Sequence, residues 1–248
     1  MISVSVVSHN HGDMVAGVVN QLLAFPEVSQ IIVTLNVPEP WLLPDHDRVK
    51  VVRNVAPKGF GANHNAAYGH VSAGLALKGT DVQYFCVLNP DIEFQGNPFP
   101  ALLKCLQDSQ AGIVAPAILN VDGTLADSAR YFPTPIGLLK KALGRGDGRY
   151  HYGLNDAPLA VDWVAGMFVV FSRPVFERLR GFDEKYFLYY EDVDICARAH
   201  QLKESVILCP QCAAIHDARR TSRKSLRFLS WHLSSMARFF IKRYLSTL

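Results

Sequence analysis

Ile2-Ser3-Val4-Ser5-Val6-Val7 is an apolar run rich in β-branched residues, and it predicts a buried strand near the start of the chain. A helix pattern follows from about Asp13 to Phe25, where Pro26 closes it. The same alternation continues, with strands expected at 31–33, 49–52 and 82–88 and a helix at about 62–77. Strands separated by helices of this length predict βαβ units. We therefore expect an α/β fold with a doubly wound, mostly parallel sheet and helices on both faces.

The second half of the chain is less regular. Residues 120–124 favour a hairpin, and 144–158 are a loop rich in Gly, Pro and Asn. A strand is expected at 161–171 and a helix at 191–200. We predict one domain over 1–218, with two halves at about 1–118 and 119–218, followed by a basic amphipathic helix at 219–248.

The composition is typical of a folded globular protein, since the 248 residues are 49% hydrophobic and 19% charged. The net charge of +3 hides an uneven distribution, because residues 219–248 hold eight Lys or Arg and no Asp or Glu. The rest of the chain has 17 basic and 22 acidic residues. This basic tail indicates an anionic partner, and its bulky apolar residues favour a membrane over a nucleic acid.

The tail also carries an apolar stripe at helical spacing, formed by Leu229, Leu233, Met236, Phe240 and Tyr244. Such helices lie on anionic membranes, although a helix docked on the core with a solvated basic face explains the pattern equally well. No apolar run reaches the ~18–20 residues that span a bilayer. The start lacks a charged leader, and five cysteines, an odd number, fit a reducing compartment. We therefore expect a cytoplasmic protein with peripheral contact at the inner face of the cell membrane.

Residues 181–194, Gly-Phe-Asp-Glu-Lys-Tyr-Phe-Leu-Tyr-Tyr-Glu-Asp-Val-Asp, combine aromatic and acidic side chains. Acids at the start of a helix are favoured by its dipole, which accounts for one or two of Glu191, Asp192 and Asp194. The dipole does not account for the aromatic run directly before them. A carboxylate that aromatic side chains partly desolvate has a raised pKa and is a stronger base. The segment therefore predicts a catalytic carboxylate.

Four other motifs allow either a functional or a structural interpretation. The glycine turn from Lys58 to Asn65 opens a helix, and such turns bind phosphate or polar ring edges but are also common without a ligand. Asn89-Pro90-Asp91 follows a buried strand, where a carboxylate can hold Mg²⁺ or Mn²⁺ and where a type I turn is equally expected. Trp163 to Gly166 is either a half-buried strand or a place where a substrate ring approaches the backbone. His216, near Arg219, is either structural or in contact with metal or phosphate.

Taken together, these blocks resemble the family 2 glycosyltransferases of the GT-A fold, and most of all the bacterial rhamnosyltransferase-like members. The resemblance rests on Gly59 to Asn65, Asn89-Pro90-Asp91, Trp163 to Gly166 and the run from Gly181 to Arg198, which follow one another over most of the chain. It implies inverting transfer of a sugar, with rhamnose as the first candidate, from a dTDP- or UDP-linked donor. The implied acceptor is a hydroxyl of a growing polysaccharide or lipid-linked saccharide. The donor would bind to residues 1–118 and the acceptor to residues 119–218.

The same resemblance implies roles for individual residues. Asp192 matches the general base, and Glu191 matches a group that orients the base or the acceptor. Asp91 matches the acid that holds Mg²⁺ or Mn²⁺, with His216 as a second metal residue. The residues expected to bind the donor are Ser8, Asn10, Asn36, Lys58, Gly59, Phe60, Asn63, Asn65, Asn89, Asp91 and Arg219. The residues expected to bind the acceptor are Trp163, Gly166 and Asp194.

The chain departs from the family pattern after its second strand, where Leu35-Asn36 stands in place of the usual Asp-Asn. A non-catalytic sugar-nucleotide-binding partner in a membrane-associated assembly complex is an alternative function. A sugar-1-phosphate nucleotidylyltransferase is another, but Ser8 to Asp13 lacks the Gly-rich, Arg-containing loop of that chemistry. A nucleic-acid-binding module is disfavoured because the basic residues lie among bulky apolar ones.

Overall fold

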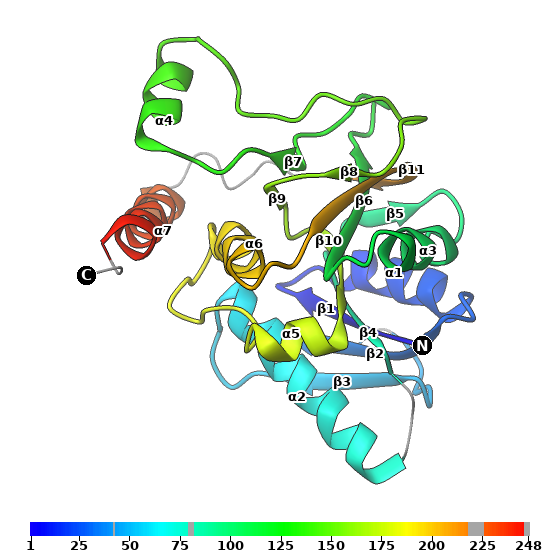
Figure 1. The fold of residues 1–248 in the computed structure, drawn as a ribbon. Coiled ribbons are helices and arrows are strands. Elements are labelled where there is room, and N and C mark those ends of the chain that lie inside the picture. Colours follow the sequence, from blue (N-terminus) through cyan, green and yellow to red (C-terminus); the bar gives the residue numbers. More distant parts are fainter. Residues whose placement is uncertain (42, 79–81, 218–225, 246–248) are drawn as a thin grey trace.

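A nine-stranded sheet forms the centre of the part of the chain that the structure describes (Figure 1). The structure is a computed structural model, and it describes residues 1–41, 43–78, 82–217 and 226–245. The strands of this sheet are β1 (Ile2–Ser8), β2 (Val28–Leu35), β3 (Val49–Arg53), β4 (Tyr84–Leu88), β5 (Ile92–Phe94), β6 (Ile113–Leu119), β8 (Leu159–Ala160), β10 (Phe168–Ser172) and β11 (Val206–His216). Their order is β3-β2-β1-β4-β10-β6-β11-β5, and β8 pairs with β11.

Most neighbouring strands are parallel: β1 pairs this way with β2 and β4, β2 with β3, and β6 with β11. Strands β10, β5 and β8 run antiparallel to their partners. The predicted mostly parallel sheet is therefore confirmed. Because β1, β2, β4 and β11 run the same way, they end at one edge of the sheet, which we call the carboxyl edge.

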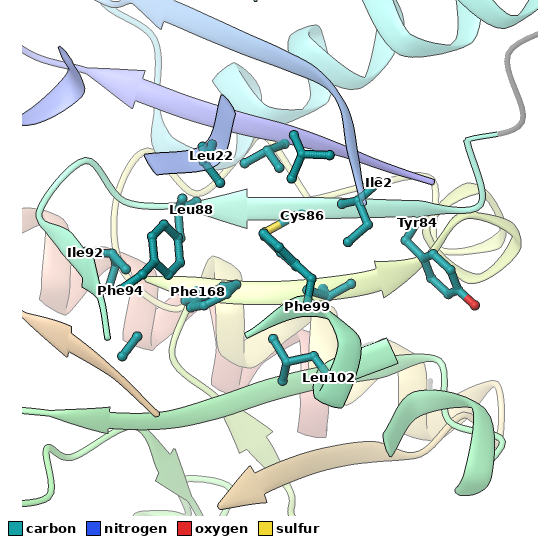
Figure 2. Packing of buried hydrophobic residues seen from close by; sticks show 14 of the residues in the cluster. Ile2, Leu22, Tyr84, Cys86, Leu88, Ile92, Phe94, Phe99, Leu102 and Phe168 are labelled. Carbon is teal, nitrogen blue, oxygen red and sulfur yellow. The ribbon is translucent and has the colours of Figure 1, made fainter. Parts of the chain in front are cut away.

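Helices cover both faces of this sheet. Alternate side chains along a strand point to opposite faces, so alternate residues of β4 join two different hydrophobic clusters. The first cluster includes α1 (Gly12–Leu23) and α3 (Phe99–Asp108), and Figure 2 shows Phe99 in it with Phe94 and Phe168. The second includes α2 (Phe60–Lys78), α5 (Arg173–Arg178) and α6 (Glu191–Gln201). The expected helices at about 13–25, 62–77 and 191–200 correspond to α1, α2 and α6.

The single strand predicted at 161–171 is wrong. The chain forms β9 (Trp163–Val164), which pairs with β7 (Ala129–Arg130) in a separate two-stranded sheet, and then β10. The amides between them have other partners: the Ala165 N–H donates to the Ser128 carbonyl, and the Gly166 N–H donates to the Asp192 carboxylate. These tertiary hydrogen bonds interrupt the ladder that the local apolar pattern predicts.

The last described helix, α7 (Leu226–Tyr244), contacts the body of the molecule through one narrow face. Its buried residues are Ser235 and Phe239, and Phe239 packs with Tyr186, Tyr190 and Val193 around the start of α6. The predicted apolar stripe forms only part of that contact: Met236 and Phe240 pack against this cluster, whereas Leu229, Leu233 and Tyr244 are 53%, 49% and 47% exposed. Each helix in the described ranges is too short or too polar to cross a membrane.

Candidate active site

Asp91 and His216 lie together at the carboxyl edge. β11 pairs with β5 so that His216 is opposite Ile92, and the Nε2 atom of His216 is 3.2 Å from Oδ2 of Asp91. The second carboxylate oxygen of Asp91, Oδ1, is buried and has no hydrogen-bond partner. An orphaned carboxylate oxygen beside an imidazole suits a divalent cation, which satisfies both groups. The two residues expected at the metal are therefore neighbours, although they lie more than a hundred residues apart in sequence.

Asp192 lies near the start of α6 and its carboxylate is held by backbone amides. Oδ2 accepts a hydrogen bond from the Gly166 N–H at 3.1 Å, and Oδ1 accepts one from the Val193 N–H at 2.8 Å. Burial raises the pKa of Asp192, and the two amide hydrogen bonds offset part of this rise. A raised pKa makes the ionised carboxylate a stronger base, which is the property that proton removal from a hydroxyl requires.

The Gly166–Met167 dipeptide links Asp192 to the Asn89-Pro90-Asp91 turn. Gly166 donates to Asp192, and the Met167 carbonyl accepts a hydrogen bond from the Asn89 N–H at 2.8 Å. Phe168, the next residue, pairs with Leu88 at the end of β4. Asp192 and the turn that carries Asp91 are therefore anchored at the same end of the β4–β10 pair.

Glu191 is the most unusual ionisable group near this edge. Its side chain is buried, and its Oε2 atom has no hydrogen-bond partner. Burial, and next the adjacent Asp192 carboxylate, raise the pKa of Glu191 well above its usual range. The neutral form of Glu191 is therefore favoured, which relieves repulsion with Asp192 and leaves Asp192 as the better base.

Two residues with a strained backbone directly precede α6. Tyr189 and Tyr190 have φ angles of 69° and 66°, a left-handed conformation that is costly for bulky side chains. Contacts with α7 hold this turn in place: the Ser235 hydroxyl donates to the Leu188 carbonyl at 2.9 Å, and the Tyr190 ring lies 5.7 Å from that of Phe239. Strain that the surroundings enforce is typical of functional sites, and here it directly precedes Glu191 and Asp192.

The glycines of the turn at Gly59 are explained by packing within the protein. A Cβ atom on Gly59 would lie 2.6 Å from the Phe187 carbonyl oxygen, and one on Gly61 would lie 2.5 Å from Cβ of Phe182. The Phe60 N–H donates to the Phe187 carbonyl at 2.9 Å. The acidic and aromatic segment 181–194 therefore packs directly on the turn at the start of α2. The contact between these two segments explains the glycines without a ligand.

The amide side chains near this turn also have partners inside the protein. Asn36 accepts hydrogen bonds from the Lys58 N–H and from Asn54, both at 2.8 Å. Asn63 donates to the Gly59 carbonyl at 3.0 Å, and Asn65 exchanges two hydrogen bonds of 2.9 Å with the Phe182 backbone. Their contact with a donor stays a prediction. A depression of about 500 Å³ borders the turn and is lined by Pro57, Lys58, Gly59, Ala62, Asn65, Ala66, Glu184 and Phe187, but not by Asp91 or Asp192.

Two of the other predicted donor residues can be located at the end of β1. Ser8, at the end of β1, is buried and accepts a hydrogen bond from the His11 N–H, while Asn10 is exposed with a φ of 65°. Both therefore lie at the carboxyl edge. Arg219 lies outside the described residues.

The predicted acceptor residues have well-defined surroundings. The Trp163 indole N–H donates to the Tyr131 carbonyl at 3.0 Å. The space above Gly166 is taken by the Phe60 ring and by Cβ of Asp192, which lie 3.2 and 3.5 Å from where a Cβ would stand. Asp194 is buried in ion pairs with Arg198 and Lys242, on a side of α6 that α7 covers. Its contact with an acceptor stays a prediction, to which the ion pairs offer a structural alternative.

Sequence reasoning missed Glu39 as a candidate site residue. Oε1 of Glu39 accepts a hydrogen bond from the Asn10 N–H at 3.1 Å, and its Oε2 is buried without a partner. The residue follows β2 by four positions, close to Leu35-Asn36, where the family pattern has an acid. Its place just after a strand that ends at the carboxyl edge is the signal that could have identified it.

Comparisons with known proteins place this geometry among sugar-transferring enzymes. No protein-family model matches the chain. The rhamnosyltransferase WbbL of Escherichia coli is 28% identical, over 98% of this chain and 94% of the relative. The N-acetylglucosaminyl-diphospho-decaprenol L-rhamnosyltransferase of Mycobacterium tuberculosis is also 28% identical, over 80% of this chain and 69% of the relative. The hexosyltransferase Agl10 of low-salt glycan biosynthesis in Haloferax volcanii is 30% identical, over 63% of this chain and 50% of the relative.

Solved structures share the fold. GalNAc-T7 with UDP, GalNAc and Mn²⁺ has a TM-score of 0.63 at 18% identity, over 88% of this chain and 43% of the other. TarS 1-349 of S. aureus with UDP has a TM-score of 0.58 at 12% identity, over 88% and 60%. This chain thus spans less than two thirds of these solved chains. The relationships do not favour a non-catalytic role. The chain is similar to rhamnosyltransferases, in one case along nearly its whole length, and it shares the fold of solved glycosyltransferases, so the comparisons support a glycosyltransferase with rhamnosyltransferase-like sequence.

Proposed function

We propose that this glycosyltransferase transfers a sugar with inversion from a nucleoside-diphosphate donor to a saccharide hydroxyl, with Asp192 as the general base. The observation that carries the proposal is the link through Gly166–Met167. Through this link, the partly buried Asp192 carboxylate, whose pKa is raised, is anchored at the same edge as the Asp91–His216 pair. A base and a cation-binding centre that share one edge are the two parts that displacement of a diphosphate requires.

Asp192 would act on the acceptor. As the acceptor oxygen attacks the anomeric carbon, its proton passes to the Asp192 carboxylate. The bond from that carbon to the diphosphate oxygen breaks on the opposite face, and the diphosphate leaves with the electron pair. The sugar is oxocarbenium-like at the midpoint, and attack from the face opposite the leaving group inverts the anomeric configuration. Glu191, neutral and directly adjacent, would orient Asp192 or the acceptor hydroxyl.

Asp91 and His216 would hold Mg²⁺ or Mn²⁺, and the bound ion would neutralise charge on the leaving diphosphate. The orphaned Oδ1 atom of Asp91 supports this assignment. The described residues contain no group of three His, Cys, Asp or Glu side chains suited to a metal. This fits a cation whose other ligands are donor phosphates and water, as Mg²⁺ commonly has.

The relatives' names and the carboxyl edge support a first choice of donor and acceptor. We propose dTDP-rhamnose as the first donor to test and UDP-linked sugars as the second, held at the carboxyl edge by residues of the 1–118 half. Asn10 and the missed Glu39 are the donor residues there that a nucleoside could reach, and the buried Ser8 lies beside them at the end of β1. The acceptor would be a saccharide on a lipid diphosphate, bound by residues of the 119–218 half. The reaction would take place at the inner face of the cell membrane.

Replacing the base tests the proposal directly. Asp192→Asn keeps the shape but cannot accept the proton, so turnover should fall by ~10²–10⁴-fold. Donor affinity, measured by thermal shift with nucleoside diphosphates and sugar nucleotides, should be unchanged, because ligands that bind the native state raise its melting temperature. Near-normal turnover in this variant would refute the role of Asp192.

The metal assignment has its own test and matched control. Asp91→Ala should abolish the increase in melting temperature that Mn²⁺ adds to a nucleoside diphosphate. Glu93→Ala removes an exposed acid two residues away and should leave that increase intact. An equal Mn²⁺ response in Asp91→Ala and in the unmodified chain would count against the Asp91–His216 centre.

A further inference from the structure

Helix α4 (Pro135–Ala142) has no buried residue. It is capped by Thr134, whose hydroxyl accepts a hydrogen bond from the Gly137 N–H at 2.9 Å. Its apolar residues face solvent: Ile136, Leu139 and the following Leu143 are 68%, 61% and 63% exposed. Isolated helices shorter than ~12–15 residues are marginal in water. The exposure of three large apolar side chains on so short a helix indicates that these side chains contact a binding partner.

Helix α7 exposes a second set of apolar residues. Leu226, Leu229 and Leu233 are 85%, 53% and 49% exposed. With 3.6 residues per turn, this stripe lies roughly a third of a turn from Ser235 and Phe239, which face the body of the molecule. Docking on the core has therefore left Leu226, Leu229 and Leu233 exposed, and a buried role does not explain these three residues.

The two helices lie near each other on one side of the molecule. The Arg243 guanidinium of α7 lies 4.6 Å from the centre of the Phe132 ring, just before α4. Burial, and next the nearby Lys141 ammonium at the end of α4, lower the pKa of His232 on α7. Figure 1 shows both helices on the side of the molecule away from α1 and α3. We call the exposed apolar and basic residues of α4 and α7 the two-helix surface.

The two stretches that form the two-helix surface carry basic residues and no acidic ones. Residues 134–146 include Lys140, Lys141 and Arg145, and the described residues 226–245 include Arg227, Arg238 and Arg243, and neither stretch contains Asp or Glu. Lys242 is not counted, because it pairs with Asp183 and Asp194. Apolar side chains flanked by Lys and Arg match the boundary between anionic headgroups and acyl chains. A second copy of this face would meet it with like charge, which disfavours a symmetric dimer.

We infer that α4 and α7 together form a docking surface for an anionic lipid bilayer. This extends the membrane contact of the proposed function to a second helix and identifies the face involved. The binding itself rests on the geometry alone; only its use for a lipid-linked acceptor rests on the proposed function. The opposite face of α7 holds the turn before Asp192, with the Trp231 ring 4.7 Å from that of Phe187. The bilayer would therefore lie next to the segment that positions the base.

Vesicle flotation of the full chain tests the inference without any sugar nucleotide. The chain should float with phosphatidylcholine vesicles that contain phosphatidylglycerol, and binding should weaken as salt is raised, because lipid attraction is screened. Leu139→Glu on α4 and Leu233→Glu on α7 should each reduce vesicle affinity by about tenfold or more. Each substitution removes the favourable transfer of one leucine side chain from water into the bilayer. Both side chains are exposed, so the melting temperature should not change.

The matched control is Leu202→Glu, at the far end of α6, where a 46% exposed leucine lies outside the two-helix surface. It should float like the unmodified chain. Failure to bind anionic vesicles at low salt, or equal binding by all three variants, would overturn the inference. So would a dimer in analytical ultracentrifugation that Leu139→Glu and Leu233→Glu dissociate. Failure of the proposed function is separate, because it would appear as no transfer to a water-soluble acceptor while flotation is intact.

Discussion

Asp194→Asn separates a structural role for Asp194 from the acceptor contact that its motif implies. The Asp194 side chain is 3% exposed and receives two cations, with Nε of Arg198 at 2.7 Å and Nζ of Lys242 at 2.6 Å. Lys242 belongs to α7, and Arg198 also donates to the Leu179 and Gly181 carbonyls. The carboxylate therefore joins α6, α7 and the start of the acidic and aromatic segment.

The size of the effect follows from this arrangement. Removing one partner of a buried ion pair costs ~3–5 kcal/mol. The asparagine keeps one acceptor oxygen, Lys242 keeps Asp183 at 3.0 Å, and Arg198 keeps two carbonyls. We therefore expect a cost at or just below the bottom of that range, ~2–3 kcal/mol. For a chain of this size each kcal/mol shifts the melting temperature by roughly 2–4 °C, so Asp194→Asn should lower it by about 4–12 °C.

The assay is thermal unfolding together with acceptor kinetics below the transition. The control Asp108→Asn breaks an exposed pair with Lys104, in which the side chains are 64% and 75% exposed, and should leave the melting temperature almost unchanged, because solvent screens exposed ion pairs. If Asp194 is structural, the apparent KM for the acceptor should stay within about twofold of that of the unmodified chain. An unchanged melting temperature with a large rise in that KM would refute the ion-pair explanation and restore the acceptor contact.

Three further predictions concern the same region. Because burial raises the pKa of Asp192, kcat/KM should begin to fall with decreasing pH while still above the ordinary aspartate range near ~3.9, and a profile flat to pH 4 would contradict this. The pKa of Glu191 is raised on folding, so the stability that protonated Glu191 contributes is present below its unfolded pKa and is lost as pH rises. The melting temperature of Glu191→Gln, measured relative to the unmodified chain, should therefore increase from pH 5 to pH 8. A difference in melting temperature that stays constant over this range would contradict the prediction. Gly59→Ala would put a Cβ 2.6 Å from the Phe187 carbonyl oxygen, and chemical denaturation should show a loss of ~1–3 kcal/mol in stability. The control Gly69→Ala, where a Cβ would have nothing within 4 Å, should be neutral or stabilising. Equal effects of the two substitutions would argue against close packing of residues 181–194 on the turn at Gly59.

Local patterns were sufficient where the determining interactions are local. The apolar runs that became β1 and β4 are buried on both faces, so their residue types alone mark them as strands. The run at 161–171 looked the same but was divided, because Asp192, almost thirty residues later, takes the Gly166 amide. The apolar pattern at 161–171 carries no information about Asp192, which competes with a neighbouring strand for the Gly166 amide.

Short-range patterns in the chain were enough to predict the class of sheet, the place of Asp91 at a strand end and the acidic start of α6, because strand and helix periodicity depend on neighbours a few residues apart. The folded arrangement was needed to show that Asp91 meets His216, that Asp194 pairs with Lys242, and that α7 leaves Leu229 and Leu233 exposed. Each of these depends on contacts between segments distant along the chain. Which face of α7 is buried is set by the shape and charge of α6 and the segment before it, and not by the helix's own hydrophobic pattern.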